Sequence, residues 1–313
     1  MKKENSVPFS PGLMSATGEI PEKLTNDIVL HSITQNSKEI LKGLTAALLM
    51  IPESGITDVE LLNPIDYRNY ADKEIVLDIR AKVNDKKILN IELQMLVSTD
   101  SVWWINRSLL YLCRTFDNLK GGGDYGDILP SMQVCIVPKD IFSGVTPEFY
   151  SQYFMKNDAN GHIYSRDFSL RVLYLNNADK ATEADKANRL DYWAEAFRAS
   201  TWEGLKELAG KGEVFRKVAE EMYTVNADVS QRSIAEAHRK YVETYTTLKN
   251  GFEREKKRAD AEEHRANIAE QRANDEKQRA DNAEQRADDE KQRADNAEAR
   301  VRELEAMLKM MPL

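Results

Sequence analysis

Two short stretches of alternating apolar residues, 75–83 and 89–95, restrict the fold of this chain more than any other feature. Every second residue in each stretch is apolar, which is the pattern of a β-strand with one buried face. Residues 84–86 between them, Asn-Asp-Lys, have the composition of a turn. The two stretches therefore predict an antiparallel hairpin. A core shared by both apolar sets requires Ile79 to lie opposite Ile91, because a shift of one residue would turn one set to the other face.

This register places two acidic residues on the opposite face of the hairpin. Asp78 is expected to lie opposite Glu92, with Cβ atoms about 5 Å apart. Like charges that face each other destabilise a sheet, so we expect a positive group between them. A cation such as Mg²⁺ fits, because its usual ligands are carboxylate oxygens, water and a backbone carbonyl such as that of Leu93. A pair of solvated acidic residues on an exposed strand face is the alternative interpretation.

The pattern up to residue 250 alternates between helices and strands. Helices are expected over residues 25–50, 101–119 and 186–222, and further strands over residues 58–63, 132–137 and 168–175. This order predicts a mixed α/β domain, over residues 25–250, with a central sheet flanked by helices. Residues 1–24 are polar and contain Pro and Gly, and are predicted to form a flexible arm.

Residues 251–313 form a third segment, in which a seven-residue pattern repeats. Alanine recurs at every seventh position from Ala259 to Ala294 and is followed by Val301 and Leu308, while the position three residues later alternates between Glu and Ala. The repeat predicts a continuous helix of about 80 Å at 1.5 Å per residue. Its apolar seam is thin before Val301. The pattern fits a weak homo-oligomeric coiled coil joined at its C-terminal end, or a solvated single helix.

The bulk composition limits the cellular setting and the partners. The chain has 313 residues and a formal net charge of −8, which does not favour binding of nucleic acid by bulk charge but leaves room for a local basic groove. The two cysteines lie in apolar stretches, so a reducing compartment fits better than a disulfide framework. No stretch approaches the roughly 20 apolar residues of a membrane span, and the N-terminus is polar. We expect a cytoplasmic protein with no membrane association.

Several segments, taken in order, resemble a known family of nucleases. They include LDIRAKVNDKKILNIELQM at residues 77–95, GGGDYGDILPSMQVCIV at residues 121–137, FSLRVLYL at residues 168–175, and the predicted helix around Arg107 and Tyr111. The set resembles the Rpn-type recombination-promoting nucleases, also described as transposases of the PD-(D/E)XK nuclease superfamily, over roughly residues 25–245. The resemblance implies a PD-(D/E)XK nuclease-like α/β fold, followed here by the long C-terminal helix.

The resemblance also implies roles for individual residues. Asp78, Glu92 and Gln94 would be catalytic, and Asp78, Glu92 and the carbonyl of Leu93 would bind Mg²⁺ or Mn²⁺. Gln94 occupies the position where the superfamily has lysine. A glutamine can orient a water molecule but cannot lower its pKa as an ammonium group can, so this task would pass to the metal. Lys82 shares a strand face with Asp78 and either supplies the missing positive charge or is a solvated strand lysine.

Four other positions have two interpretations each. Asp27, at the start of the first helix, is either a third acidic group near the metal or a favourable charge at a helix N-terminus. Arg107, Arg114 and Lys120 either line a DNA groove or form a solvated face.

The sequence thus predicts a Mg²⁺-dependent DNA endonuclease that hydrolyses phosphodiester bonds and is linked to recombination or mobile elements. One alternative is a nuclease-fold module with little cleavage, which binds DNA or protein in a mobile-element or anti-phage system. Another is an interaction protein whose working part is the coiled coil. A basic groove beside Asp78 would favour the first two, and an acidic or closed surface there would favour the third.

Overall fold

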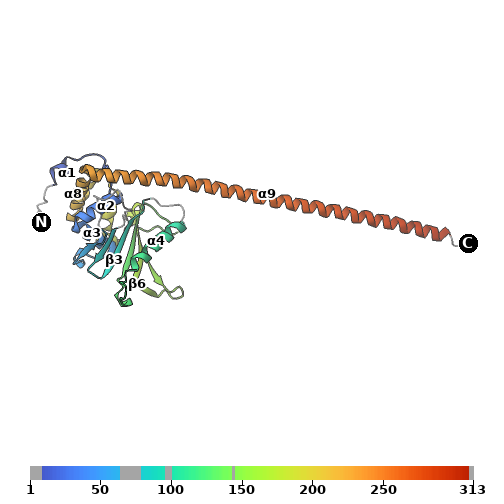
Figure 1. Cartoon of the computed structure of the whole chain (residues 1–313), viewed down its shortest axis with the longest axis horizontal. Helices are drawn as coiled ribbons and strands as arrows, with labels where there is room; N and C mark the ends of the chain where they lie inside the picture. The colour runs from blue at the N-terminus through green and yellow to red at the C-terminus, as the bar shows by residue number, and fades with distance from the viewer. Residues whose placement is uncertain (1–8, 64–78, 96–100, 143–144, 310–313) are drawn as a thin grey trace. The chain divides into compact units, whose positions relative to one another are not determined.

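The computed structural model describes residues 9–63, 79–95, 101–142 and 145–309. It divides into two compact units, residues 1–243 and 244–313. The first unit contains a six-stranded mixed sheet of order β1-β2-β3-β4-β6-β5. Figure 1 shows this sheet, with β3 and β6 labelled. The strands are β1 (Val59–Leu61), β2 (Ile79–Val83), β3 (Lys87–Leu93), β4 (Ser131–Val137), β5 (Tyr150–Lys156) and β6 (Ile163–Tyr174). The helices are α1 (Pro11–Ser15), α2 (Asp27–Asn36), α3 (Lys38–Leu49), α4 (Ser101–Phe116), α5 (Glu183–Ala187), α6 (Leu190–Arg198), α7 (Trp202–Ala209), α8 (Glu213–Ala227) and α9 (Val229–Lys309).

β2 and β3 form the predicted antiparallel hairpin. Ile79 pairs with Ile91, so the register inferred from the apolar alternation is confirmed. In the turn, Asn84 and Asp85 have φ values of 52° and 54°, and these two residue types adopt the left-handed region more readily than most others. Asp78, the expected partner of Glu92, lies outside the described residues.

The centre of the sheet is covered on both faces. β4 pairs in parallel with β3 and with β6, and all seven of its residues are buried. One face joins a large apolar core with α2, α3, α6, α7 and α8. The other face contributes Cys135, Val172 and Tyr174 to a smaller cluster with Trp104 of α4. Because α4 packs on this side, β3 is buried on both faces, which corrects the expectation of a strand with one exposed face.

The region expected to be one helix over residues 25–50 contains two. Asn26 caps α2, accepting a hydrogen bond from the Ile28 N–H at 3.0 Å. Ser37 separates the helices, and its hydroxyl accepts from the Ile40 N–H at 3.3 Å to cap α3. A side-chain acceptor at an N-cap satisfies backbone donors that would otherwise lack a partner, and so favours a new helix start at Ser37.

The N-terminal segment differs from the expected flexible arm. Residues 9–24 pack on the first unit, with Leu13 and Ile20 buried in its core. The backbone N–H of Ser10 donates to Glu220 of α8 at 2.8 Å. Single apolar residues anchor this segment. Because the residues around them are mostly polar, the sequence pattern did not predict that they would be buried. Residues 1–8 lie outside the described part of the chain.

The second unit is the C-terminal part of α9. The predicted continuous helix is confirmed, and most of its described side chains are exposed. The boundary between the units falls within this helix, after Glu243. Among the helices that the structure describes, none has the length and apolar character needed to cross a membrane.

Candidate functional site

Glu92 lies near the C-terminal end of β3, on the sheet face that α4 covers. Its side chain is 3% exposed. Arg107 of α4 donates from Nε to the Oε1 of Glu92 at 2.6 Å, and Gln133 of β4 donates from Nε2 to Oε2 at a longer 3.4 Å. A buried carboxylate is costly unless it is paired or bound to a metal. Glu92 is therefore a buried acidic group whose position needs a compensating partner.

Two opposing effects act on the pKa of Glu92. Burial is the larger and raises the pKa, while the charge and hydrogen bond of Arg107 lower it. Because a metal ligand has to be ionised, the guanidinium group supports the form of Glu92 that could bind a cation.

A chain of buried polar side chains connects Glu92 to the centre of the sheet. The Nδ2 of Asn90 donates to the Oε1 of Gln133 at 2.8 Å, and Gln133 in turn contacts Glu92. Gln133 is a residue of this site that was not predicted from the sequence. The available signal was a single glutamine within the otherwise apolar run that forms β4.

Arg107 is held by aromatic rings as well as by Glu92. Its Cζ lies 5.7 Å from the ring centre of Trp103 and 4.8 Å from that of Tyr111, which are four residues before and after it on α4. This spacing places all three side chains on one face of the helix. The Arg107 side chain is 34% exposed, so it connects the buried carboxylate to the surface.

Leu93 and Gln94 follow Glu92 at the same end of the strand. Both residues are half-buried. The backbone N–H of Gln94 donates to the carbonyl of Ile136 at 2.9 Å, which continues the pairing of β3 with β4 one residue beyond the strand. The backbone of this proposed site is thus fixed by the sheet.

Lys82 is not brought to Glu92. It pairs with Ile88 in the hairpin, four residues and about 13 Å along β3 from Glu92. Its Nζ lies 2.8 Å from Asp85 and 3.3 Å from Glu60, and these contacts raise the pKa of Lys82. The structure therefore places Lys82 among surface carboxylates at the turn end of the hairpin.

The remaining candidates lie at three different positions. Asp27 is in the first turn of α2, with Oδ2 4.0 Å from Nε2 of His238. Arg114 and Lys120 are exposed, on α4 and after its end. Arg107 pairs with Glu92 and keeps 34% of its side chain exposed.

The donors that the structure describes suit a hard divalent cation, since they are a buried carboxylate and a backbone carbonyl. Within the described ranges, no three His, Cys, Asp or Glu side chains are grouped closely enough to hold a metal ion. Asp78, the other expected ligand, is not in those ranges.

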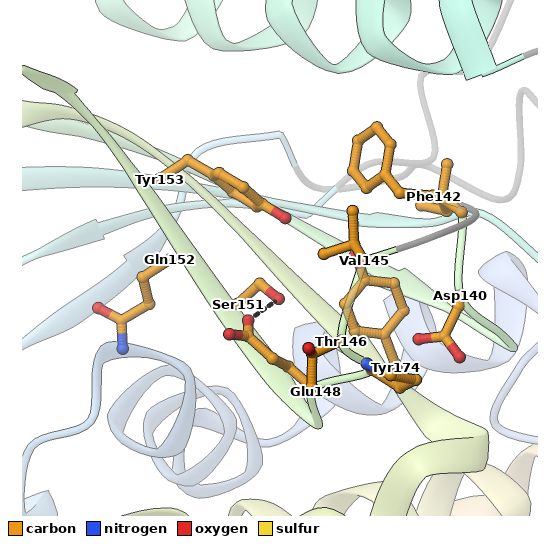
Figure 2. A pocket seen from close by; sticks show the side chains of 11 residues that line it. Asp140, Phe142, Val145, Thr146, Glu148, Ser151, Gln152, Tyr153 and Tyr174 are labelled. Carbon is orange, nitrogen blue, oxygen red and sulfur yellow. Dashed lines mark hydrogen bonds between the residues drawn. The ribbon is translucent and has the colours of Figure 1, made fainter. Parts of the chain in front are cut away.

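A separate cavity of about 200 Å³ lies beside the ends of β4 and β6. Figure 2 shows Asp140 and Glu148 around it together with Tyr153 and Tyr174. Burial raises the pKa of Tyr174. Asp140 accepts a hydrogen bond from Asn177 at 2.7 Å, and Glu148 is hydrogen-bonded to Ser151. Carboxylates at this position repel phosphate, which disfavours the cavity as a nucleic-acid site.

Comparison with known proteins gives one finding. A family model described as PD-(D/E)XK nuclease family transposase matches residues 30–251. No curated protein and no solved structure matches the chain. The matched range contains the whole sheet, α4 and every candidate residue except Asp27.

Proposed function

The chain belongs to the PD-(D/E)XK nuclease family transposases, and from this we propose that it is a divalent-metal-dependent DNA endonuclease acting in recombination or on mobile elements. The observation that carries the proposal is the buried Glu92 carboxylate at the end of β3, which is paired with the guanidinium group of Arg107. Apolar residues often replace a buried ion pair without loss of stability. A buried ionisable group beside a specific charge partner, within the range matched by a nuclease family, is therefore a candidate functional residue.

We infer that Glu92, the carbonyl of Leu93 and Asp78 hold Mg²⁺ or Mn²⁺. Asp78 lies outside the described residues, and the support for it is the register of the hairpin. Ile79 pairs with Ile91. Asp78 directly precedes Ile79 in the sequence, and Glu92 directly follows Ile91. When bound, the metal supplies positive charge that lowers the pKa of the attacking water and stabilises the phosphate. The amide of Gln94 would position that water.

Exposed cations of the α4 region are the proposed contacts to DNA. Arg114 and Lys120 lie at the surface, where they can bind backbone phosphates without reading sequence. The pairing of Arg107 with Glu92 favours a second candidate function, a DNA-binding module with weak cleavage, because the cation occupies the carboxylate that a metal needs.

Cleavage of supercoiled plasmid DNA distinguishes the two functions. The endonuclease is expected to convert the plasmid to nicked circles in Mg²⁺ or Mn²⁺ and to stop in EDTA. The binding module would retard the plasmid on a gel and leave it supercoiled in all three conditions.

We also propose that the second unit pairs with a second copy of itself. The heptad pattern of the repeat continues upstream to Leu248 and Phe252, which are 69% and 71% exposed, and at the other end Val301 and Leu304 are also exposed. Arginine occurs at every seventh position from 258 to 300, and five of the seven positions five residues later, from 263 to 305, are Glu. These are the flanking positions that face each other in a parallel pair of helices, so the charges are complementary.

Truncation after Asn250 is expected to change assembly and leave the chemistry unchanged. Removal of residues 251–313 takes away most of the exposed seam but no part of the first unit. Sedimentation equilibrium should show dimers of the full chain and monomers of the truncated one, with equal single-turnover cleavage rates. Pairing of two sites would suit cutting of both strands of a duplex. Identical stoichiometry of the two proteins would instead identify the repeat as a solvated spacer.

A further inference from the structure

The contacts of Glu92 leave no carboxylate oxygen without a donor. Oε1 accepts from Arg107 and Oε2 from Gln133. A cation bound at Oε1 would meet the positively charged guanidinium group, which lies 2.6 Å from the same oxygen. Arg107 and a metal ion therefore compete for the negative charge of Glu92.

We propose that Arg107 is an exchangeable counter-ion of the metal site, which neutralises Glu92 in the metal-free protein and moves to a DNA phosphate when the metal binds. The inference rests on the proposed function, since it assumes that Glu92 is a metal ligand. It adds a positioning residue from α4 to a site otherwise built from the hairpin.

The surroundings of Arg107 allow this exchange. The described contact of Arg107 with Glu92 is made by Nε, whereas a two-nitrogen fork binds carboxylates most strongly. The rings of Trp103 and Tyr111 offer its guanidinium group a second favourable contact that does not depend on Glu92. Gln133 is a neutral donor, so it can keep its contact with Oε2 and hold the carboxylate in place while Arg107 moves.

The exchange also meets a chemical need of this site. Gln94 stands where a lysine would supply positive charge, and Lys82 is held by Asp85 and Glu60 at the far end of the hairpin. Arg107 is already at the site and half-exposed. Its planar group matches the geometry of a phosphate, which it can bind with two parallel hydrogen bonds.

Calorimetric titration of the full chain with Mn²⁺, without DNA, tests the exchange. Arg107→Gln removes the competing charge, and a charged hydrogen bond of this kind corresponds to roughly tenfold or more in affinity. The variant is expected to bind Mn²⁺ at least about tenfold more tightly than the wild type. In EDTA, Arg107→Gln should also melt at a lower temperature than the wild type. Addition of Mn²⁺ should raise its melting temperature by more than it raises that of the wild type. Arg107→Lys keeps the positive charge, so its Mn²⁺ affinity is expected to stay close to that of the wild type. This variant replaces Arg107→Gln in the comparison if the Gln variant does not fold.

Arg114→Gln is the matched control. It lies on the same helix and also over Tyr111, at 5.9 Å, and its described contacts do not include Glu92. Its Mn²⁺ affinity should equal that of the wild type. If the wild type binds Mn²⁺ and Arg107→Gln binds it equally or more weakly, the exchange is overturned, Arg107 merely orients Glu92, and the proposed nuclease stands. If none of the proteins binds Mn²⁺, the proposed function fails together with the inference.

Discussion

Replacement of Glu92 by Gln is expected to lower Mg²⁺-dependent DNA cleavage by about a thousandfold or more. The amide has the same shape and can still accept a hydrogen bond from Arg107, but it lacks the charge of a metal ligand. Charge stabilisation by a catalytic metal amounts to several kcal/mol, and about 1.4 kcal/mol corresponds to tenfold in rate. The measurement is the single-turnover rate of plasmid nicking at saturating Mg²⁺.

The fold should tolerate this change, which separates loss of chemistry from loss of structure. Burial raises the pKa of Glu92, so ionising this group costs more in the folded state than in the unfolded state, and Gln removes that cost. The melting temperature of the Glu92→Gln variant is expected to be equal to that of the wild type or higher. Glu60→Gln is the matched control, because Glu60 lies on β1, two strands from Glu92, is exposed, and pairs with Lys82 away from the site. Wild-type cleavage by pure Glu92→Gln protein would remove Glu92 from the mechanism.

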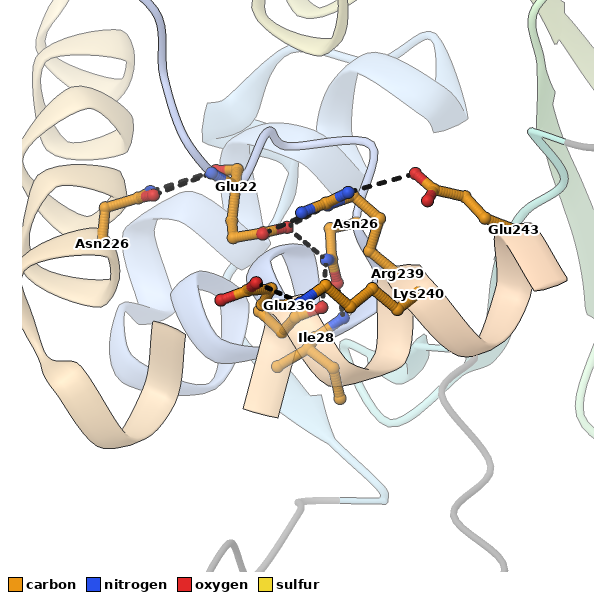
Figure 3. A network of polar contacts seen from close by, with 9 residues as sticks. Glu22, Asn26, Ile28, Asn226, Glu236, Arg239, Lys240 and Glu243 are labelled. Atoms are coloured by element: carbon orange, nitrogen blue, oxygen red, sulfur yellow. Dashed lines mark hydrogen bonds and ion pairs between the residues drawn. The ribbon is translucent and has the colours of Figure 1, made fainter. Parts of the chain in front are cut away.

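Replacement of Arg239 by Ala is expected to cause a large loss of stability. Figure 3 shows the buried Glu22 carboxylate, 3% exposed, between Arg239 of α9 and Asn26 at the start of α2. Arg239 donates from Nε to both carboxylate oxygens at 3.2 and 3.3 Å, and Asn26 donates at 3.0 Å. Without Arg239, the buried charge keeps only a neutral donor among these partners.

The expected loss is about 2 kcal/mol. Breaking a fully buried ion pair costs about 3–5 kcal/mol, and the Arg239 side chain is 42% exposed, so solvent screens part of this interaction. Urea unfolding followed by tryptophan fluorescence measures the change in the first unit. Arg258→Ala, on the same helix with an exposed Glu255 as partner, should change stability by less than about 0.5 kcal/mol. Equal stability of the two variants would show that the Glu22 pair adds nothing.

The hairpin could be predicted in detail because its information is local. Period-two alternation and a polar turn determine which residues face the core, and a one-residue error would bury the wrong set. The family resemblance and the long repeat could be recognised for a similar reason. The first depends on the order of segments in the sequence, and the second on a regular spacing of residues. Strand β5 gave no such signal, because its sequence, YSQYFMK, belongs to a partly exposed edge strand without regular alternation.

The partners of Glu92 could not be predicted because they come from other elements. Arg107 is fifteen residues away and Gln133 forty-one, and only the packing of α4 on the sheet brings them together. The same packing buries the face of β3 that the alternation pattern left exposed. The two-helix arrangement of residues 25–50 depends on a capping hydroxyl at Ser37, within an apolar pattern that continues on both sides.

The most direct test of the proposed metal site is plasmid nicking by the wild type, Asp78→Ala and Glu92→Gln, purified identically and assayed in Mg²⁺, in Mn²⁺ and in EDTA. We expect the wild type to nick in both metals and not in EDTA, and neither variant to nick in any condition. Nicking by the wild type in EDTA, or nicking by both variants at the wild-type rate, would contradict a metal site formed by Asp78 and Glu92.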